Sequence, residues 1–360
     1  MLLMLFQKQI LSVYHQKIRI KGVGMPKSIF YEQQKQVQIA WRKNNISSAE
    51  HGYQNGQPYE HVIPRILWEE TLWQGIRKDL PDYLSSRKIQ SHTGTHNLLS
   101  SWIVCANLYY IIRINDGFKK LMLGFLQEHV SEKITRIKET ELEFALDGEL
   151  SPKNLLGEQD GKRGSGQTSP DVAFIVETDS GDGIVLTECK YTEHSFYRCS
   201  ARRTNTDHKD KIANPAPDRC MHVAKGYNYK TICHQTVWQR KYWNHLTLSE
   251  YGKENLVRCP ASTDGYQLFR QQSLAEGISA TNTYGLVVTS VAFDGRNQTL
   301  IKCMKATGVP DFTTEWEKLF TGKALFKTWT HQEWVEYVRQ NGKDPMQKEW
   351  VEYMNIRYGY

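Results

Sequence analysis

Two apolar stretches separated by a turn-forming pentapeptide constrain the fold of this chain more than any other part of its sequence. Residues 171–176 read Asp-Val-Ala-Phe-Ile-Val, and residues 184–191 read Ile-Val-Leu-Thr-Glu-Cys-Lys-Tyr. Between them, residues 179–183 read Asp-Ser-Gly-Asp-Gly, which suits a tight hairpin turn. The segment therefore predicts two paired β-strands, and the second of them ends in charged residues.

The charged residues of this predicted hairpin point to chemistry. Glu188 and Lys190 are two residues apart, so their side chains share one face of the sheet and Cys189 points to the other. Asp171 opens the first strand and would lie near them. Ionisable side chains on a buried sheet are costly unless they are paired or bind a metal. We therefore interpret Asp171, Glu188 and Lys190 as candidate catalytic residues.

The spacing of these residues resembles a known signature. Pro170-Asp171, followed after a hydrophobic strand by Glu188-Cys189-Lys190, is similar to the PD-(D/E)xK motif of the restriction-endonuclease-like nuclease superfamily. The stretches HNLLSSW at 96–102 and TECKYTE at 187–193 extend the similarity to an uncharacterised bacterial branch of putative restriction endonucleases in that superfamily.

The resemblance implies both a fold and an activity. The implied fold is α/β, with an αβββαβ core in which helices flank a mixed central sheet. The implied activity is metal-dependent hydrolysis of DNA phosphodiester bonds, by an endonuclease acting in bacterial defence. Restriction enzymes commonly act as dimers to reach two strands, so the resemblance also suggests a homodimer.

Asp171 and Glu188 supply the hard oxygen ligands that Mg²⁺ prefers, and Mn²⁺ is an alternative ion. The main-chain carbonyl of Cys189 is a candidate further ligand. Lys190 can position the attacking water or stabilise charge in the transition state, and it can also assist deprotonation; we expect positioning and electrostatics first. A further acid often comes from the first core helix in this superfamily. The sequence leaves two candidates for it, Glu128 and Glu143.

Periodicity supplies the remaining elements. It predicts helices over 26–45, 95–113, 118–137 and 266–276, and strands over 141–146 and 284–293. With the hairpin, this gives the element order of the implied core. We divide the chain into a flexible arm or mis-assigned start at 1–24, an N-terminal helical layer at 25–94, a nuclease core at 95–309 and a C-terminal helical segment at 310–360. We expect the aromatic residues of the last segment to pack on the domain rather than to stack on bases.

Positive charge is concentrated after the motif. Residues 195–260 contain twelve Lys and Arg against five Asp and Glu, so this segment accounts for the net charge of +7 of the whole chain. Positive potential beside a phosphodiester site favours nucleic-acid binding. The candidate nucleic-acid contacts are Lys162, Arg163, Arg202, Arg203, Gln267, Arg270 and Gln271.

Other classes of protein are less consistent with the sequence. No apolar run is long enough to span a membrane, and the chain has neither a Gly-x-Ser-x-Gly elbow nor a dinucleotide fingerprint. Seven scattered cysteines predict reduced thiols and a cytoplasmic protein. The basic segment also contains six Cys and His residues: Cys199, Cys220, His222, Cys233, His234 and Cys259. They include no Cys-x-x-Cys pair, so their spacing does not favour a structural zinc site, although it leaves open whether one exists.

Two alternatives to the nuclease remain open at this stage. One is a catalytically silent nucleic-acid-binding protein on the same fold. The other is an unrelated α/β protein in which Glu188 and Lys190 form a surface ion pair. Burial of these side chains distinguishes the second alternative from the other two interpretations.

Overall fold

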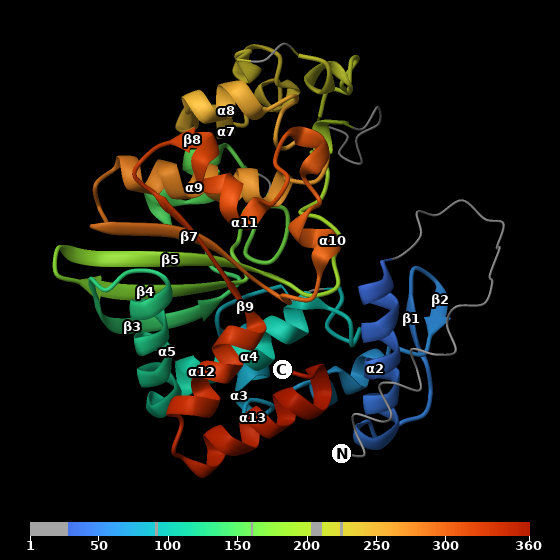
Figure 1. Cartoon of the computed structure of the whole chain (residues 1–360). Helices are drawn as coiled ribbons and strands as arrows, with labels where there is room; N and C mark the ends of the chain where they lie inside the picture. Colours follow the sequence, from blue (N-terminus) through green and yellow to red (C-terminus); the bar gives the residue numbers. More distant parts are fainter. Residues whose placement is uncertain (1–27, 91–92, 160, 203–210, 224–225) are drawn as a thin grey trace.

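A five-stranded mixed sheet lies at the centre of the molecule (Figure 1). The computed structural model describes residues 28–90, 93–159, 161–202, 211–223 and 226–360, so the predicted arm at 1–24 and Arg203 lie outside the described residues. In the order β3-β4-β5-β7-β9, β4 is antiparallel to β3 and β5, whereas β5, β7 and β9 are parallel. The strands are β3 (Ile134–Leu142), β4 (Val172–Thr178), β5 (Gly181–Lys190), β7 (Leu286–Phe293) and β9 (Leu325–Thr330).

Helices from both ends of the chain cover one face of this sheet (Figure 1). Their apolar side chains form one core with Val185 and Cys189 of β5. These helices are α2 (Ile29–Asn45), α3 (Asp79–Ser86), α4 (Ser101–Ile114), α5 (Asp116–His129), α12 (His331–Asn341) and α13 (Pro345–Tyr358). The short hairpin of β1 (Gly52–Gln54) and β2 (Gln57–Tyr59) lies beside α2 in the figure.

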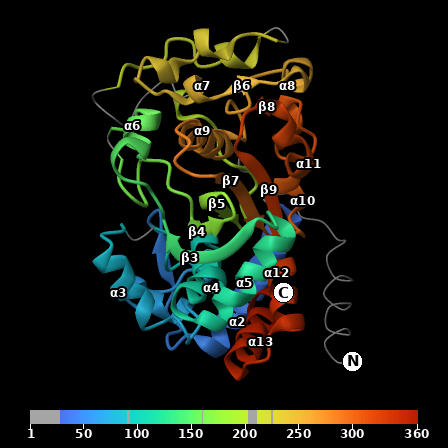
Figure 2. The same cartoon turned by 90° about the vertical axis from the view of Figure 1, so that its left-hand side faces the viewer.

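Helix α9 (Tyr266–Ala280) and a set of short elements cover the opposite face, as Figure 2 shows from the side. They form a second core with Ile184 and Leu186 of β5. The short elements are α6 (Pro152–Leu156), α7 (Tyr242–His245), α8 (Glu250–Asn255), α10 (Gln298–Ile301), α11 (Phe312–Glu315) and the paired strands β6 (Thr247–Leu248) and β8 (Phe320–Thr321). The chain is thus a mixed α/β protein in which helices flank a central sheet on both faces.

The predicted hairpin is confirmed. Strands β4 and β5 pair from Val172 with Thr187 to Thr178 with Gly181, which leaves Asp179 and Ser180 as the turn. Gly181 has a φ of 112°, in the range that favours glycine over residues with a side chain. The local turn chemistry and the alternation of apolar residues therefore specify the same structure. The predicted helix over 266–276 and strand over 284–293 are also present, as α9 and β7.

The predicted helix over 118–137 is wrong in its last part, because β3 begins at Ile134. The pairing of β3 with β4 is shifted at two places along this stretch. Ile134 and Ile137 both enter the buried core although they are three residues apart. Bulges in the strand thus imitate the apolar spacing of a helix.

Helix α4 begins at Ser101, later than the predicted start at Thr95. The N–H of Leu98 donates to the carbonyl of His61, and the N–H of Ile63 donates to that of His96. Residues 96–98 are thus held in an extended pairing with 61–63, which delays the first turn of the helix.

Strand β9 lies within the segment predicted to be wholly helical, so that prediction is wrong there. Phe326 packs in the core on the α9 side, whereas Trp329 packs in the core on the α4 side. Apolar residues three apart suggest a helix, but in a strand buried on both faces the same spacing simply places them on opposite sides.

The large aromatic residues of the C-terminal segment pack inside the molecule, as predicted. Trp316, Trp329, Trp334 and Trp350 are almost fully buried. The indole N–H of Trp350 donates to the carbonyl of Asn107 on α4 at 2.9 Å. Among the described residues, no helix has both the length and the apolar character needed to cross a bilayer.

Replacing Trp350 by alanine should lower the free energy of unfolding by about 3–5 kcal/mol, because it leaves a large cavity between α4, α12 and α13. Ile356 on the same helix is 60% exposed, so Ile356→Ala should change it by less than about 0.5 kcal/mol. Urea unfolding followed by circular dichroism measures both changes. Equal effects of the two substitutions would contradict the packing described for α13.

Candidate active site

Three strand ends meet at one edge of the central sheet. Because β4 is antiparallel to its two neighbours, its first residue pairs with the last residue of β3 and with Thr187 of β5. The next residues outward are Glu143 after β3, Asp171 before β4 and Glu188 on β5. Strand pairing therefore brings three acidic residues from separate parts of the sequence to one place.

Glu188 and Lys190 form a buried ion pair on the face of β5 that α9 covers. The Lys190 Nζ lies 2.7 Å from Glu188 Oε1, and the two side chains are 3% and 8% exposed. The Nε2 of Gln267, on α9, donates to the same oxygen at 2.8 Å. Burial excludes the alternative in which these residues form a surface ion pair.

Asp171 is held beside this pair by the main chain of β5. Its Oδ2 accepts a 2.7 Å hydrogen bond from the N–H of Cys189. Burial raises the pKa of the Asp171 carboxyl well above its ordinary value; the charge of Glu188 raises it further, and Lys190 draws it partly back. The environment of Asp171 therefore disfavours its ionised form unless more positive charge is brought close.

Glu143 lies with these residues, whereas Glu128 does not. Glu143 has a φ of 48°, a left-handed conformation, and its N–H donates to the carbonyl of Asp171 at 3.0 Å. Burial, followed by repulsion from Glu188, raises the pKa of Glu143 to about 8. Glu128 is exposed on α5 and interacts with Tyr337 of α12. Of the two acids that the sequence left open, geometry favours Glu143.

Lys190 is surrounded by groups that stabilise its ammonium form. Burial alone would lower its pKa, but attraction to Glu188 and then to Glu193 and Asp171 outweighs burial and raises it. Its Nζ lies 5.9 Å from the ring centre of Phe196 and 5.7 Å from that of Tyr197.

Glu193 and Tyr197 are part of these surroundings, and the sequence analysis missed both as site residues. They follow the end of β5, where the alternation of a strand no longer indicates direction. One feature of the sequence could have identified Glu193 as a site residue: it is the last residue of the stretch TECKYTE and lies only three residues after Lys190.

Comparison with known proteins identifies a family for this chain. A family model described as "Restriction Endonuclease associating with ARP" matches residues 33–359. The chain belongs to this family. No curated protein and no solved structure matches the chain.

The family match extends from within α2 to the end of α13, so both helical layers belong to the unit that this endonuclease family shares. The helical layer that contains α4 also contacts the candidate site, on the face of the sheet opposite to α9. The thiol of Cys189 points away from Glu188 and hydrogen-bonds with that of Cys105 on α4, and burial raises the pKa of both thiols. This agrees with the predicted alternation along β5.

Two of the arginines predicted to contact nucleic acid point inward in this family member. Arg163 pairs with Glu141 at 2.8 Å and donates to the carbonyl of Glu143. Arg270 forms an ion pair with the fully buried Glu158 at 3.1 Å. Both arginines therefore fix the loop between β3 and β4 in place.

The other predicted contacts are distributed differently. Gln267 reaches the site through Glu188, and Gln271 donates to the carbonyl of Leu186 at 2.8 Å. Arg202 donates to the carbonyl of Ser262. Lys162 is exposed in the loop before β4, which leaves it accessible to a nucleic-acid backbone.

The donors at this edge suit a hard divalent cation. Mg²⁺ keeps several waters and binds through one or two carboxylates, and Asp171 and Glu188 offer two. Within the described ranges, no three His, Cys, Asp or Glu side chains are grouped so that they could hold a metal ion together. An ion held by Asp171 and Glu188 would therefore keep much of its own water.

Glu143 generates a pH dependence of stability. Its pKa of about 8 exceeds the ordinary value of about 4.3, so the folded protein binds a proton that the unfolded chain releases between these pH values. The free energy of unfolding should therefore fall as pH rises through this window. Glu143→Gln removes this effect, and urea unfolding in a chelator should show the variant more stable than the parent by a few kcal/mol at pH 8.5 and similar at pH 5.

The exposed Glu128 provides the matched control. Glu128→Gln should keep the pH slope of the parent protein, because its carboxyl stays in solvent in both states. An unchanged slope in Glu143→Gln would show that the carboxyl of Glu143 is not held in its protonated form.

Proposed function

We propose that the chain is a divalent-metal-dependent endonuclease of the PD-(D/E)xK type that hydrolyses DNA phosphodiester bonds. The observation that carries the proposal is the convergence of Asp171, Glu188 and Lys190 at one edge of the sheet. The family description supports the reaction class. A cytoplasmic role in bacterial defence would follow from that class.

Asp171 and Glu188 would hold Mg²⁺ or Mn²⁺, with the main-chain carbonyl of Cys189 as a further ligand. The ion would supply charge neutralisation at the scissile phosphate and acidify a bound water. The protein's own part is to present two carboxylates from neighbouring strands at a fixed separation. The hydrogen bond from the Cys189 N–H to Asp171 and that from Gln267 to Glu188 orient them.

Lys190 would act as a fixed positive charge rather than as a base. Its raised pKa keeps the ammonium form at neutral pH as long as Glu188 is ionised beside it. An ammonium cannot accept a proton, but it can stabilise the negative charge that develops on the phosphate oxygens. Without a cation, Glu143 with its pKa of about 8 is mostly protonated at neutral pH; the positive charge of a bound ion would lower this pKa, and the carboxylate could then accept a proton from the attacking water.

Tyr197 is the exposed aromatic group nearest to this centre. It is 52% exposed, and its ring lies beside Lys190. A base or sugar of a bound strand could stack on it while the neighbouring phosphate meets Lys190. Lys162, on the loop before β4, would contact the backbone further along.

Lys190→Ala and Asp171→Ala should each lower the rate of Mg²⁺-dependent plasmid cleavage by ~100-fold or more, because the first removes a positive charge that stabilises the transition state and the second removes a ligand of the ion. Binding of a labelled duplex in Ca²⁺, measured by fluorescence anisotropy, should change much less. Cleavage by both variants at the parent rate would refute the site. A parent protein that binds DNA but cleaves no substrate with any metal would instead be a silent binding protein.

Glu143 and Glu128 form a matched pair for testing which acid completes the site. Glu143→Gln should reduce plasmid cleavage by ~10-fold or more, and Glu128→Gln should leave it unchanged, since only Glu143 faces Asp171 and Glu188. Initial rates at several Mg²⁺ concentrations measure both effects. The reverse result would place the missing acid on α5.

A further inference from the structure

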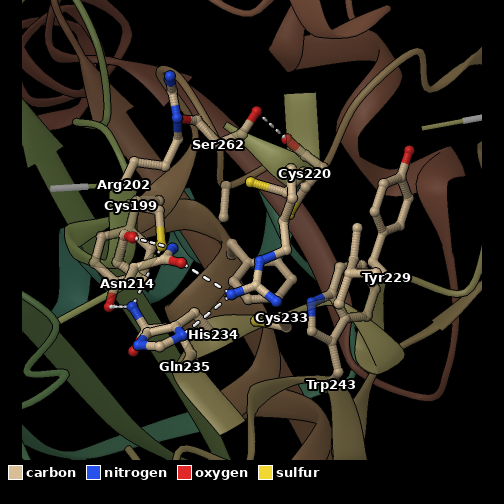
Figure 3. Close-up of a pocket in the computed structure, with 17 residues that line it drawn as sticks. Cys199, Arg202, Asn214, Cys220, Tyr229, Cys233, His234, Gln235, Trp243 and Ser262 are labelled. Atoms are coloured by element: carbon tan, nitrogen blue, oxygen red, sulfur yellow. Dashed lines mark hydrogen bonds between the residues drawn. The ribbon is translucent and has the colours of Figure 1, made fainter. Parts of the chain in front are cut away.

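Four of the seven cysteines line one pocket on the far side of α9 from the sheet. Cys199, Cys220, Cys233 and Cys259 come from four separate segments of the chain and line the same pocket, and Figure 3 labels the first three of them. Cys199 and Cys259 are buried, and the other two are partly buried. The cavity is about 30 Å³, room for an ion or a water but not for an organic cofactor.

The segment that carries these cysteines has little regular structure of its own. Between β5 and α9, the longest element of the described part is the six-residue helix α8. The other elements there are α7, β6 and single-turn helices at Ser200–Arg202, Arg219–Met221, Tyr229–Thr231 and His234–Thr236. An ion bound between the turns of such a segment would add to the apolar contacts that hold it against α9.

Main-chain N–H groups are aimed at three of the four sulfurs. The N–H of Ala201 donates to the sulfur of Cys199, that of Ala261 to the sulfur of Cys259, and that of Gln235 to the sulfur of Cys233. In each case the donor lies two residues after the cysteine. Donors at this position satisfy sulfurs that carry negative charge, as ligands of a metal do.

Positive side chains complete the surroundings of the thiols. Arg202 and Arg219 both lie near Cys220, where Asp218 opposes their charge, and Arg219 also lies near Cys233. The Nε2 of Gln235 lies 3.3 Å from the sulfur of Cys199. Four thiolates around a divalent cation carry a net charge of −2, and Arg219 would offset part of it, whereas Arg202 is already paired with Asp218.

The nearby histidine is already engaged. His234 lines the same pocket, but its Nε2 contacts the carbonyl of Ile212 at 3.0 Å and its Nδ1 contacts Arg219 at 3.3 Å. This leaves the four sulfurs as the available soft ligands.

We propose that Cys199, Cys220, Cys233 and Cys259 bind one zinc ion in a structural tetrathiolate site. The site is independent of the candidate active site, which lies on the other side of α9. As the side chains stand, no three of them meet the geometry of a metal site. Binding would therefore rotate the thiols inward to about 2.3 Å from the ion and release their protons.

A sequence search for Cys-x-x-Cys pairs does not detect such a site, since its ligands are brought together by the tertiary fold.

The test is the metal content of the full chain purified without chelator under reducing conditions. Elemental analysis should find close to one zinc per chain. Replacing zinc by Co²⁺ should give the intense visible absorption of a tetrahedral thiolate site. Cys220→Ser and Cys233→Ser should each lower the zinc content at least tenfold, whereas Cys303→Ser, outside the pocket, should retain it.

Because a cysteine variant can fail to fold, the parent protein is also tested directly. A chelator should lower its melting temperature, and added zinc should restore it. A parent protein that neither contains zinc nor takes up Zn²⁺ or Co²⁺ would overturn the proposal. So would an intact mass showing that these cysteines are joined as disulfides.

Discussion

The buried ion pair between Lys190 and Glu188 is the interaction on which the rest of the site depends. Taking two charges out of water is costly, and such a pair is tolerated only when other hydrogen bonds complete it. Gln267 of α9 supplies one of these bonds to Glu188. One turn further along the same helix, Arg270 pairs with Glu158 and so anchors the loop that leads to Asp171. A single helix therefore positions both strands that carry the candidate ligands.

Local patterns in the sequence were sufficient to predict the β4–β5 hairpin, but they were insufficient to predict the edge strands β3 and β9. The sequence predicts the turn at Asp179 and Ser180 and the alternation along β5, because both features depend only on residues that are neighbours in the chain. Strand β3 contains bulges, and β9 is buried on both faces; both features give apolar spacings of three residues that suggest helices. Glu143 could not be chosen over Glu128, because its place depends on strand pairing and on a left-handed backbone angle.

Charge counted along the sequence also differs from charge available at the surface. The basic segment suggested a nucleic-acid interface, yet Arg202 is bound to the main chain of Ser262 and Arg219 lies beside thiols. Arg163 and Arg270, just outside that segment, are held by buried acids. Arginine side chains that are held by such contacts position loops and cysteine sulfurs. A bound strand would meet the residues that remain exposed, such as Lys162 and Tyr197.

The place of β9 in the sheet has a consequence for how the protein is made. Strands β3, β4 and β5 leave the ribosome early. Strand β9, which pairs with the edge of β7, and helix α13, which completes the core on that side, are synthesised much later. Until those residues emerge, β7 presents an open edge and the α4 layer lacks Trp334 and Trp350. A nascent chain can therefore hold every candidate catalytic residue while its scaffold is still incomplete. If the chain is the endonuclease proposed above, such a delay would keep that activity silent until synthesis is complete.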